Sequence, residues 1–328
     1  MKALVDKLTS GDVRSAARLI RMIDDNQPAA RDALKQLFPH TRRARVIGIT
    51  GPPGAGKSTL TSCLIESARQ QQMSVGVLAV DPSSPMSGGA ILGDRIRMNR
   101  HTLDKEVYIR SLASRGHFGG ITPATRGAIR VLDAMGKDVI IVETVGVGQD
   151  EVDIARLADT TVIVWVPGLG DDIQAMKAGI LEVADIFVVN KAEHPDAEVT
   201  SNYLKSVFRQ EKNTTGVPRD WMPPVVETVA TKGWGIDALW DVLDQHREYV
   251  AGASDYYVVR KQKACRAELE NFVHQGLSEK FTTQFADSAM MEEKVVQIAS
   301  GEADIYAVAE SLLAEITVPR QHHVDQLA

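Results

Sequence analysis

The chain has 328 residues, of which 44% are hydrophobic and 24% are charged, a composition typical of a globular protein with a sizeable core. Its formal net charge of −6 argues against nucleic acid or an anionic membrane as a partner. The amino-terminal residues do not resemble a signal peptide, and no apolar run is long enough to span a bilayer. The two cysteines, Cys63 and Cys265, favour a reducing, cytoplasmic location over a disulfide framework.

Residues 1–44 predict a helical amino-terminal extension. Apolar residues from Leu4 to Ile23 recur at the spacing of one helical face. Pro28 then favours the start of a second helix, which we expect to stop near Pro39.

From residue 45 to about residue 250, short apolar runs alternate with helical patterns. Such nearly continuous apolar runs are typical of parallel strands that helices cover on both faces. We therefore predict an α/β domain over residues 45–250 with a mainly parallel sheet flanked by helices. The predicted strands are Val46–Thr50, Val75–Val80, Val107–Leu112, Val139–Val142, Thr161–Val166, Ile186–Val189 and Val225–Val229.

Residues 251–328 show no further strand and predict a helical carboxyl-terminal arm. The arm carries an apolar stripe, which either packs against the α/β domain or, as we favour, forms the interface of a homodimer. The stripe consists of Leu269, Phe272, Val273, Leu277, Phe281 and Phe285.

The stretch GPPGAGKS, residues 51–58, follows the first predicted strand and precedes a predicted helix, Thr59–Gln70. It matches the phosphate-binding loop Gly-x-x-x-x-Gly-Lys-Ser, whose backbone N–H groups surround phosphate oxygens at a helix amino terminus. Lys57 is expected to reach the β- and γ-phosphates and to act in catalysis, and the Ser58 hydroxyl to bind Mg²⁺. This motif makes the predicted fold a P-loop NTPase. The expected nucleotide contacts are Gly51, Pro52, Pro53, Gly54, Ala55, Gly56, Lys57, Ser58 and Thr59.

Three acidic residues are candidates for the metal site and the hydrolytic centre. Glu143 ends a predicted strand and is followed by Gly146, as in the Asp-x-x-Gly motif of GTPases, so we expect it in the Mg²⁺ shell. The amide of Gly146 is placed to contact the γ-phosphate. Asp81 and Asp94 lie in or near a glycine-rich segment of the kind that senses nucleotide, although a helix cap is an alternative for each.

The residue after Gly146 is Val147, where many GTPases have the glutamine that orients the attacking water. Hydrolysis is therefore expected to be slow without a partner. We expect Asp81, Arg97 or Lys177 to orient water or to offset charge.

The stretch FVVNKAEH, residues 187–194, resembles the Asn-Lys-x-Asp motif that reads guanine, with Glu193 in place of the aspartate. A carboxylate accepts hydrogen bonds from N1–H and the 2-amino group of guanine, and adenine offers neither donor. Because glutamate keeps both acceptor oxygens, we predict GTP and GDP as ligands. Asn190 is expected to brace the loop, and the Lys191 stem to cover the base.

A second base-reading segment follows the next predicted strand. Ala230, Thr231 and Lys232 fall where guanine-nucleotide proteins present a backbone N–H to the O6 oxygen. Two such elements, each at a strand end and in the right order, support guanine over adenine.

Together these motifs resemble the ArgK/MeaB family of methylmalonyl-CoA mutase-associated G proteins. The resemblance extends from about residue 46 to residue 240. It implies a GTP-hydrolysing homodimer that binds an adenosylcobalamin-dependent methylmalonyl-CoA mutase, gates cofactor loading and protects the mutase. It also implies that residues 168–177 contact the partner, with Lys177 at their end, and that Asp94 and Glu143 belong to the metal shell. Further segments that carry it are VDPSSP, GGAILGDRIRM, SRGHFGGI and PGLGDDIQAMKAGI.

Three alternatives stay open at the level of sequence. An ATP-dependent kinase associated with transport would prefer adenine. A metal-insertion G protein would need histidine or cysteine ligands near the P-loop, where Cys63 is better explained by core packing. A scaffold that binds nucleotide without hydrolysing it would explain Val147.

Overall fold

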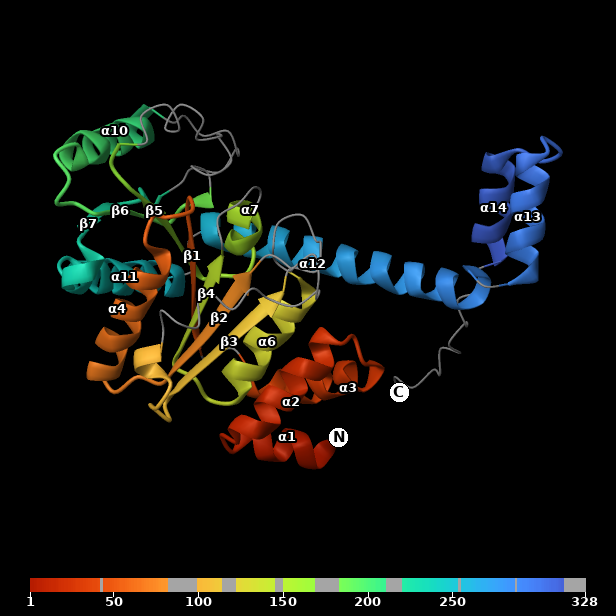
Figure 1. The fold of residues 1–328 in the computed structure, drawn as a ribbon, viewed down its shortest axis with the longest axis horizontal. Coiled ribbons are helices and arrows are strands. Elements are labelled where there is room, and N and C mark those ends of the chain that lie inside the picture. The colour runs from red at the N-terminus through yellow and green to blue at the C-terminus, as the bar shows by residue number, and fades with distance from the viewer. Residues whose placement is uncertain are drawn as a thin grey trace, which may run out of the picture. The chain divides into compact units, whose positions relative to one another are not determined.

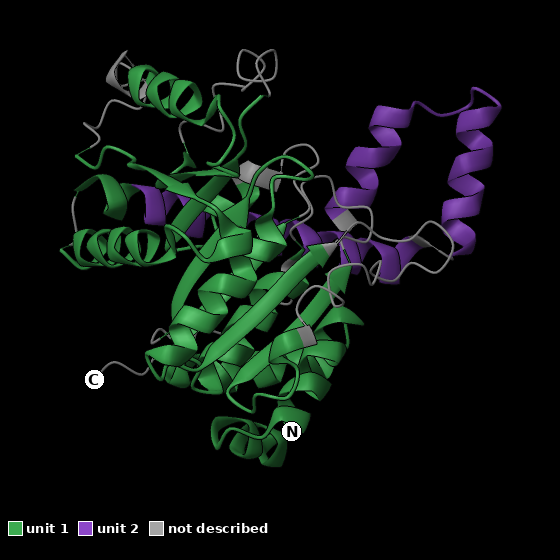
Figure 2. Ribbon diagram, turned by 60° about the vertical axis from the view of Figure 1, so that its left-hand side comes forward, with its two compact units in different colours: residues 1–259 green, residues 260–328 purple. Residues whose placement is uncertain are grey.

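The computed structural model describes residues 1–41, 44–81, 99–113, 122–144, 150–168, 183–210, 220–252, 255–286 and 288–315. These residues form two compact units, 1–259 and 260–328 (Figure 2). The amino-terminal helices belong to the first unit, together with the sheet.

A parallel sheet forms the centre of the first unit (Figure 1). Across the described residues it has seven strands in the order β3-β2-β4-β1-β5-β6-β7. Every strand predicted from the sequence is present, with ends that agree to within two residues, so the predicted α/β fold is confirmed. Because the strands are parallel, their carboxyl ends meet at one edge of the sheet. The strands are β1 (Arg45–Thr50), β2 (Val75–Asp81), β3 (Val107–Ala113), β4 (Val139–Thr144), β5 (Thr160–Trp165), β6 (Ile186–Asn190) and β7 (Val225–Thr228).

Helices cover both faces of the sheet, as the continuous apolar strands predict. One face packs against α4 (Lys57–Gln70) and α11 (Ile236–Ala251). The other packs against α6 (Pro123–Ala134), α7 (Asp150–Ala155) and α10 (Ala197–Gln210).

The amino-terminal extension contains α1 (Lys2–Thr9), α2 (Val13–Asp24) and α3 (Pro28–Leu37). The single helix expected up to Ile23 is wrong, because the chain turns at Gly11, whose φ of +90° suits glycine. The carboxylate of Asp12 then caps α2 by accepting a hydrogen bond of 2.8 Å from the backbone N–H of Ser15. These helices pack on α6, where a Cβ at Gly127 would approach Ile23 to 2.8 Å.

The described part of the carboxyl-terminal region contains α12 (Asp255–Phe281), a π-helical turn (Thr282–Ala286), α13 (Ala289–Ala299) and α14 (Ile305–Glu315). The second unit, which begins within α12, has its own small core of Phe285, Val308 and Leu312. Phe285 is only 1% exposed, so it does not belong to the apolar stripe in which the sequence placed it. None of the helices in the described residues is long and apolar enough to cross a membrane.

Candidate functional site

The phosphate-binding loop joins β1 to α4 at the carboxyl edge of the sheet (Figure 1). Gly51, Gly54 and Gly56 have φ values of 139°, 77° and 90°, which side chains disfavour. Two of these glycines also face close neighbours. A Cβ at Gly51 would lie 2.0 Å from the carbonyl oxygen of Val164, and one at Gly56 would lie 2.4 Å from Asn190 Nδ2. The glycines therefore allow the loop to lie directly against β5 and the end of β6.

Lys57 begins α4, and its ammonium group points back into the loop. Its Nζ donates hydrogen bonds to the carbonyl oxygens of Gly51, at 2.8 Å, and Pro52, at 3.0 Å. The residue is only 7% exposed. The loop thus holds a buried positive charge at the amino terminus of a helix, a combination that attracts phosphate.

Glu143, near the end of β4, lies beside α4. Its carboxylate accepts hydrogen bonds from Ser58 Oγ at 2.6 Å and from Thr61 Oγ1 at 2.8 Å. The register of the sheet places Glu143 opposite Ile49, close to the start of the loop. The arrangement directs the Ser58 hydrogen toward a carboxylate, so the serine oxygen can act as an acceptor or a metal ligand.

Asn190, at the end of β6, connects three segments of the site. Its Nδ2 donates to the carbonyl oxygen of Ala55 at 2.8 Å, and its Oδ1 accepts from Thr228 Oγ1 and from the backbone N–H of Ala230, both at 3.1 Å. Because the side chain is 3% exposed, these bonds are shielded from water. The phosphate loop, β6 and the segment after β7 are therefore held in a fixed arrangement.

The residues that follow β6 and β7 lie at the same edge. Lys191 has a φ of 59°, a left-handed conformation that costs a residue with a side chain about 1–2 kcal/mol. Glu193 is exposed. Ala230, Thr231 and Lys232 form a short 3₁₀ helix, and the N–H of Ala230 is engaged with Asn190.

Cys63 on α4 also contacts this segment. Its Sγ donates a hydrogen bond of 3.0 Å to the carbonyl oxygen of Ala230. The side chain is partly buried and packs against the sheet core, so it has both a packing and a bonding role. Burial raises the pKa of this thiol, and the nearby Glu66 carboxylate raises it further.

The structure brings together the phosphate loop, Glu143, Asn190 and the residues after β6 and β7. Asp81 ends β2, but its side chain is not described. Asp94, Arg97, Gly146 and Lys177 lie outside the described residues.

Sequence reasoning missed three contributors to this site. Thr61 lies three residues after Ser58 on α4, so helical spacing could have identified it as a second partner of Glu143. The bonds made by Cys63 and Thr228 join segments far apart in the chain, and no local pattern indicates them.

Comparison with known proteins agrees with this geometry. The family described as methylmalonyl Co-A mutase-associated GTPase MeaB matches residues 16–286. The chain belongs to this family. It is a MeaB-family GTPase, and its nucleotide is a guanine nucleotide.

Related MeaB-type proteins cover most of the chain. A protein of Pyrococcus abyssi with a GTPase name is 46% identical over 95% of this chain and 96% of its own. GTPase ArgK of Escherichia coli is 32% identical over 79% of this chain and 80% of its own. The mouse methylmalonic aciduria type A homolog, a mitochondrial protein, is 34% identical over 76% of this chain and 61% of its own.

A solved structure has the same fold. It is named as a LAO/AO transport system kinase and is 21% identical, with a TM-score of 0.68 over 97% of each chain. At this identity the likeness supports the P-loop NTPase fold of the MeaB-family chain and no more.

Proposed function

We propose that this GTPase assists an adenosylcobalamin-dependent methylmalonyl-CoA mutase, gating the loading of its cofactor and protecting it from inactivation. The observation that carries the proposal is the family match, since the family is described as mutase-associated. A cytoplasmic location is part of the proposal and is supported by the free thiols of Cys63 and Cys265.

In this proposal the phosphates of GTP or GDP bind to residues 51–59. The Lys57 ammonium, which now donates to two carbonyls of its own loop, turns to the β- and γ-phosphates. The loop already holds the positive charge, so nucleotide binding requires Lys57 to exchange its hydrogen-bond partners.

The proposed Mg²⁺ site is built on Ser58 and Glu143, with Asp94 as a further acid. The donors are hard oxygens, which suit Mg²⁺. Glu143 orients the Ser58 hydroxyl by accepting its hydrogen bond at 2.6 Å, so the serine oxygen can bind the metal while its hydrogen points toward the carboxylate. Bound Mg²⁺ would neutralise charge on the β- and γ-phosphates.

We further propose that Glu193 reads guanine and that Lys191 covers the base. Asn190 supports both residues, because it holds the end of β6 against the phosphate loop and the 230–232 segment. The proposal has two further parts. The amide of Gly146 contacts the γ-phosphate, and the groups that orient water or offset charge are Asp81, Arg97 and Lys177. With Val147 after Gly146, hydrolysis is expected to be slow until a partner is bound.

Binding of the full-length chain to a purified candidate mutase tests this proposal. Co-purification is measured without nucleotide, with GDP and with a non-hydrolysable GTP analogue, and cofactor loading is followed by absorbance. We expect a complex in which the rate of loading depends on the nucleotide. Lys57→Ala is expected to remove that dependence, whereas Lys35→Ala, at an exposed position on α3, serves as control. The absence of a complex in every nucleotide state would exclude the chaperone role.

A further inference from the structure

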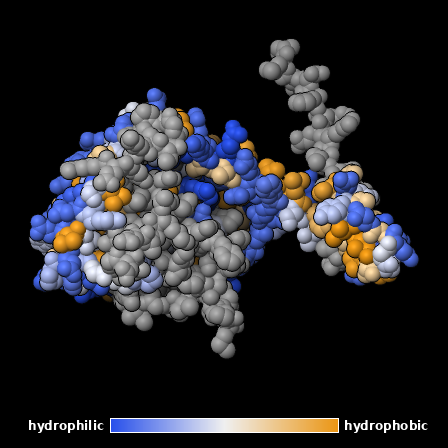
Figure 3. Space-filling model, turned by 90° about the horizontal axis from the view of Figure 1, so that it is seen from above, coloured by the Kyte–Doolittle hydropathy of each residue, from blue (hydrophilic) through white to orange (hydrophobic). Residues whose placement is uncertain are grey.

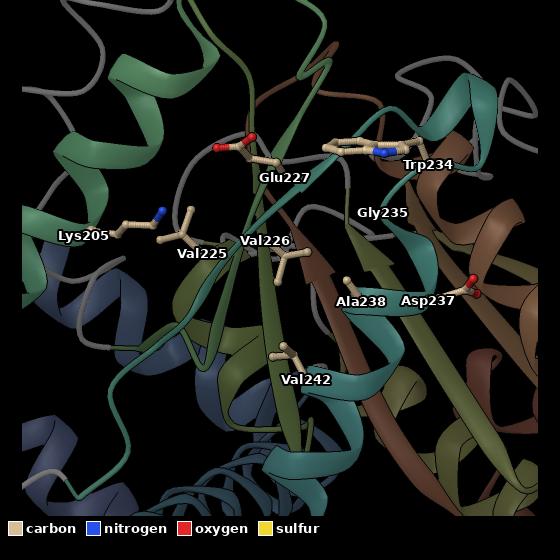
Figure 4. Close-up of a pocket in the computed structure, with 9 residues that line it drawn as sticks. All are labelled: Lys205, Val225, Val226, Glu227, Trp234, Gly235, Asp237, Ala238 and Val242. Carbon is tan, nitrogen blue, oxygen red and sulfur yellow. The ribbon is translucent and has the colours of Figure 1, made fainter.

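A pocket of about 520 Å³ lies along β7, the strand that ends the sheet. Figure 4 looks onto β7, with Lys205 of α10 on one side and Ala238 and Val242 of α11 on the other. The pocket involves neither the phosphate loop nor Asn190, and the nucleotide site does not account for it.

The floor of this groove offers unused backbone groups. The N–H of Phe187 donates to the carbonyl of Pro224, and the N–H of Ala192 donates to the carbonyl of Thr228. Because backbone direction alternates along a strand, the intervening residues Val225 and Glu227 point their N–H and C=O groups away from β6. Gly235 packs against the Glu227 carbonyl, where a Cβ would lie 2.2 Å away. The N–H and C=O of Val225 and the N–H of Glu227 therefore face the groove, and they have no hydrogen-bond partner among the described residues.

The walls of the groove combine an apolar side with a charged rim. Val226, Ala238 and Val242 form the apolar side, and Trp234 stands above them with 55% of its surface exposed (Figure 4). Lys205, Glu227 and Asp237 are the charged groups, so the rim carries more negative than positive charge. A small ligand would not need the strand edge, whereas an extended peptide can use the backbone groups, the apolar wall and the charges together.

We propose that this groove binds an extended segment of a partner protein, which adds to the sheet as a strand beside β7. Backbone bonds to Val225 and Glu227 provide the attachment. An apolar side chain of the segment packs against Trp234 and Ala238, and a basic side chain pairs with Asp237. Edge strands with free backbone groups bind such segments readily unless they are covered. This peptide-binding proposal does not rest on the mutase. Either proposal, peptide binding at β7 or assistance to a mutase, can therefore be wrong while the other is correct.

The test uses the full-length protein and the capped peptide acetyl-Lys-Thr-Val-Thr-Val-Lys-amide. Binding is measured by the change in tryptophan fluorescence, to which Trp234 contributes together with three other tryptophans, and by the amide NMR signals of Val225 and Glu227. We expect saturable binding that shifts both amides. The same peptide with N-methyl groups on alternate amides, which cannot donate to the strand edge, is expected to bind at least about tenfold more weakly.

A matched pair of variants separates the groove from the rest of the surface. Ala238→Phe fills the groove at an exposed helical position and should abolish peptide binding. Ala251→Phe makes the same change at the exposed end of α11 and should not alter it. Neither variant should alter GDP affinity. The proposal is overturned if the peptide does not bind, if N-methylation has no effect, or if Ala238→Phe binds like the wild type. It is also overturned if the protein alone associates through this edge and Ala238→Phe makes it monomeric.

Discussion

At the scale of single residues, Asn190 determines how the nucleotide site is held together. One buried side chain bonds to the phosphate loop, to β7 and to the segment after it. The sequence predicted the bracing role of Asn190 from its place in a motif. The sequence could not predict that Asn190 Oδ1 accepts a hydrogen bond from the N–H of Ala230, because that bond depends on how two distant loops pack together.

Asn190→Ala should therefore weaken both folding and nucleotide binding. The substitution leaves the Ala55 carbonyl, the Thr228 hydroxyl and the Ala230 N–H without their partner in a buried site. Each such loss costs about 1–3 kcal/mol, so we expect a decrease of that size or more in the free energy of unfolding. Urea denaturation and calorimetric titration with GDP measure the two effects. Asn202→Ala, on the exposed face of α10, should change neither the free energy of unfolding nor the GDP affinity. If Asn190→Ala had no larger effect than Asn202→Ala, the bracing role of Asn190 would be contradicted.

Glu193 should determine the choice of base. We expect Glu193→Ala to lose most of the preference for GDP over ADP, because a carboxylate that accepts from guanine contributes about 1.5–3 kcal/mol for each hydrogen bond. Titration with both nucleotides in the presence of Mg²⁺ gives the ratio of affinities. Glu198→Ala, at an exposed position on α10, is the control. An unchanged ratio in Glu193→Ala would show that another group reads the base.

The two cysteines should differ in reactivity. Cys63 is partly buried and hydrogen-bonded to Ala230, and burial together with Glu66 raises its pKa, so little thiolate is present at neutral pH. Cys265 is exposed. We expect iodoacetamide to modify Cys265 first, as measured by peptide mass spectrometry over time. Faster modification of Cys63 would mean that α4 and the 230–232 segment separate readily.

At the scale of elements, the sequence predicted the strands well and the helix ends less well. Apolar runs such as Ile186–Val189 are buried on both faces, and this is why they are continuous and easily recognised. The break between α1 and α2 was missed because the apolar spacing continues across it. Only Gly11 and the capping Asp12 signal the turn.

Lys137, in the turn between α6 and β4, should make the free energy of unfolding change with pH in the alkaline range. Its side chain is buried and donates to the Glu106 carbonyl at 2.9 Å, and burial lowers its pKa from 10.5. Between the lowered pKa and 10.5 the unfolded chain binds more protons than the folded chain, so stability rises with pH in this window.

Lys137→Met removes the buried ammonium group and with it this dependence of stability on pH. The Glu106 carbonyl keeps the N–H of Val75 as a partner at 2.9 Å, so the variant should be similar to or more stable than the wild type at neutral pH. Its advantage should shrink as the pH rises toward 10.5. Urea denaturation at a series of pH values measures the difference. If the difference in unfolding free energy between Lys137→Met and the wild type stays constant with pH, then burial does not shift the pKa of Lys137 between the folded and unfolded states. Lys35→Met, at an exposed site on α3, provides the baseline.

At the scale of the whole molecule, the least predictable feature was which apolar surfaces are covered. The sequence showed apolar stripes on the amino-terminal helices and on α12 alike. In the structure the first stripe packs on α6 within the first unit. On α12, Leu269, Phe272 and Val273 stay 65%, 46% and 51% exposed. Figure 3 shows that apolar residues gather on the surface of the second unit. Periodicity indicates that a face is apolar and does not indicate what covers it.

We propose that the exposed α12 stripe is covered by a second copy of the chain. Leu269, Val273 and Leu277 follow one another at a spacing of four residues, so they form one side of the helix that a partner helix can bury. Each buried apolar Å² contributes about 25 cal/mol, which favours association. A homodimer should therefore appear in light scattering coupled to size exclusion, with a mass that falls on dilution.

The double variant Leu269→Glu and Val273→Glu places two like charges in that interface and should yield a monomer, because an unpaired buried charge costs more than the apolar contact contributes. Asn271→Glu adds a negative charge on the opposite side of α12 and should leave the dimer intact. GDP affinity should be the same in all three proteins, since α12 does not contribute to the nucleotide site described above. A wild-type protein that stays monomeric at every concentration, or a double variant that still dimerises, would show that this stripe has another partner or none.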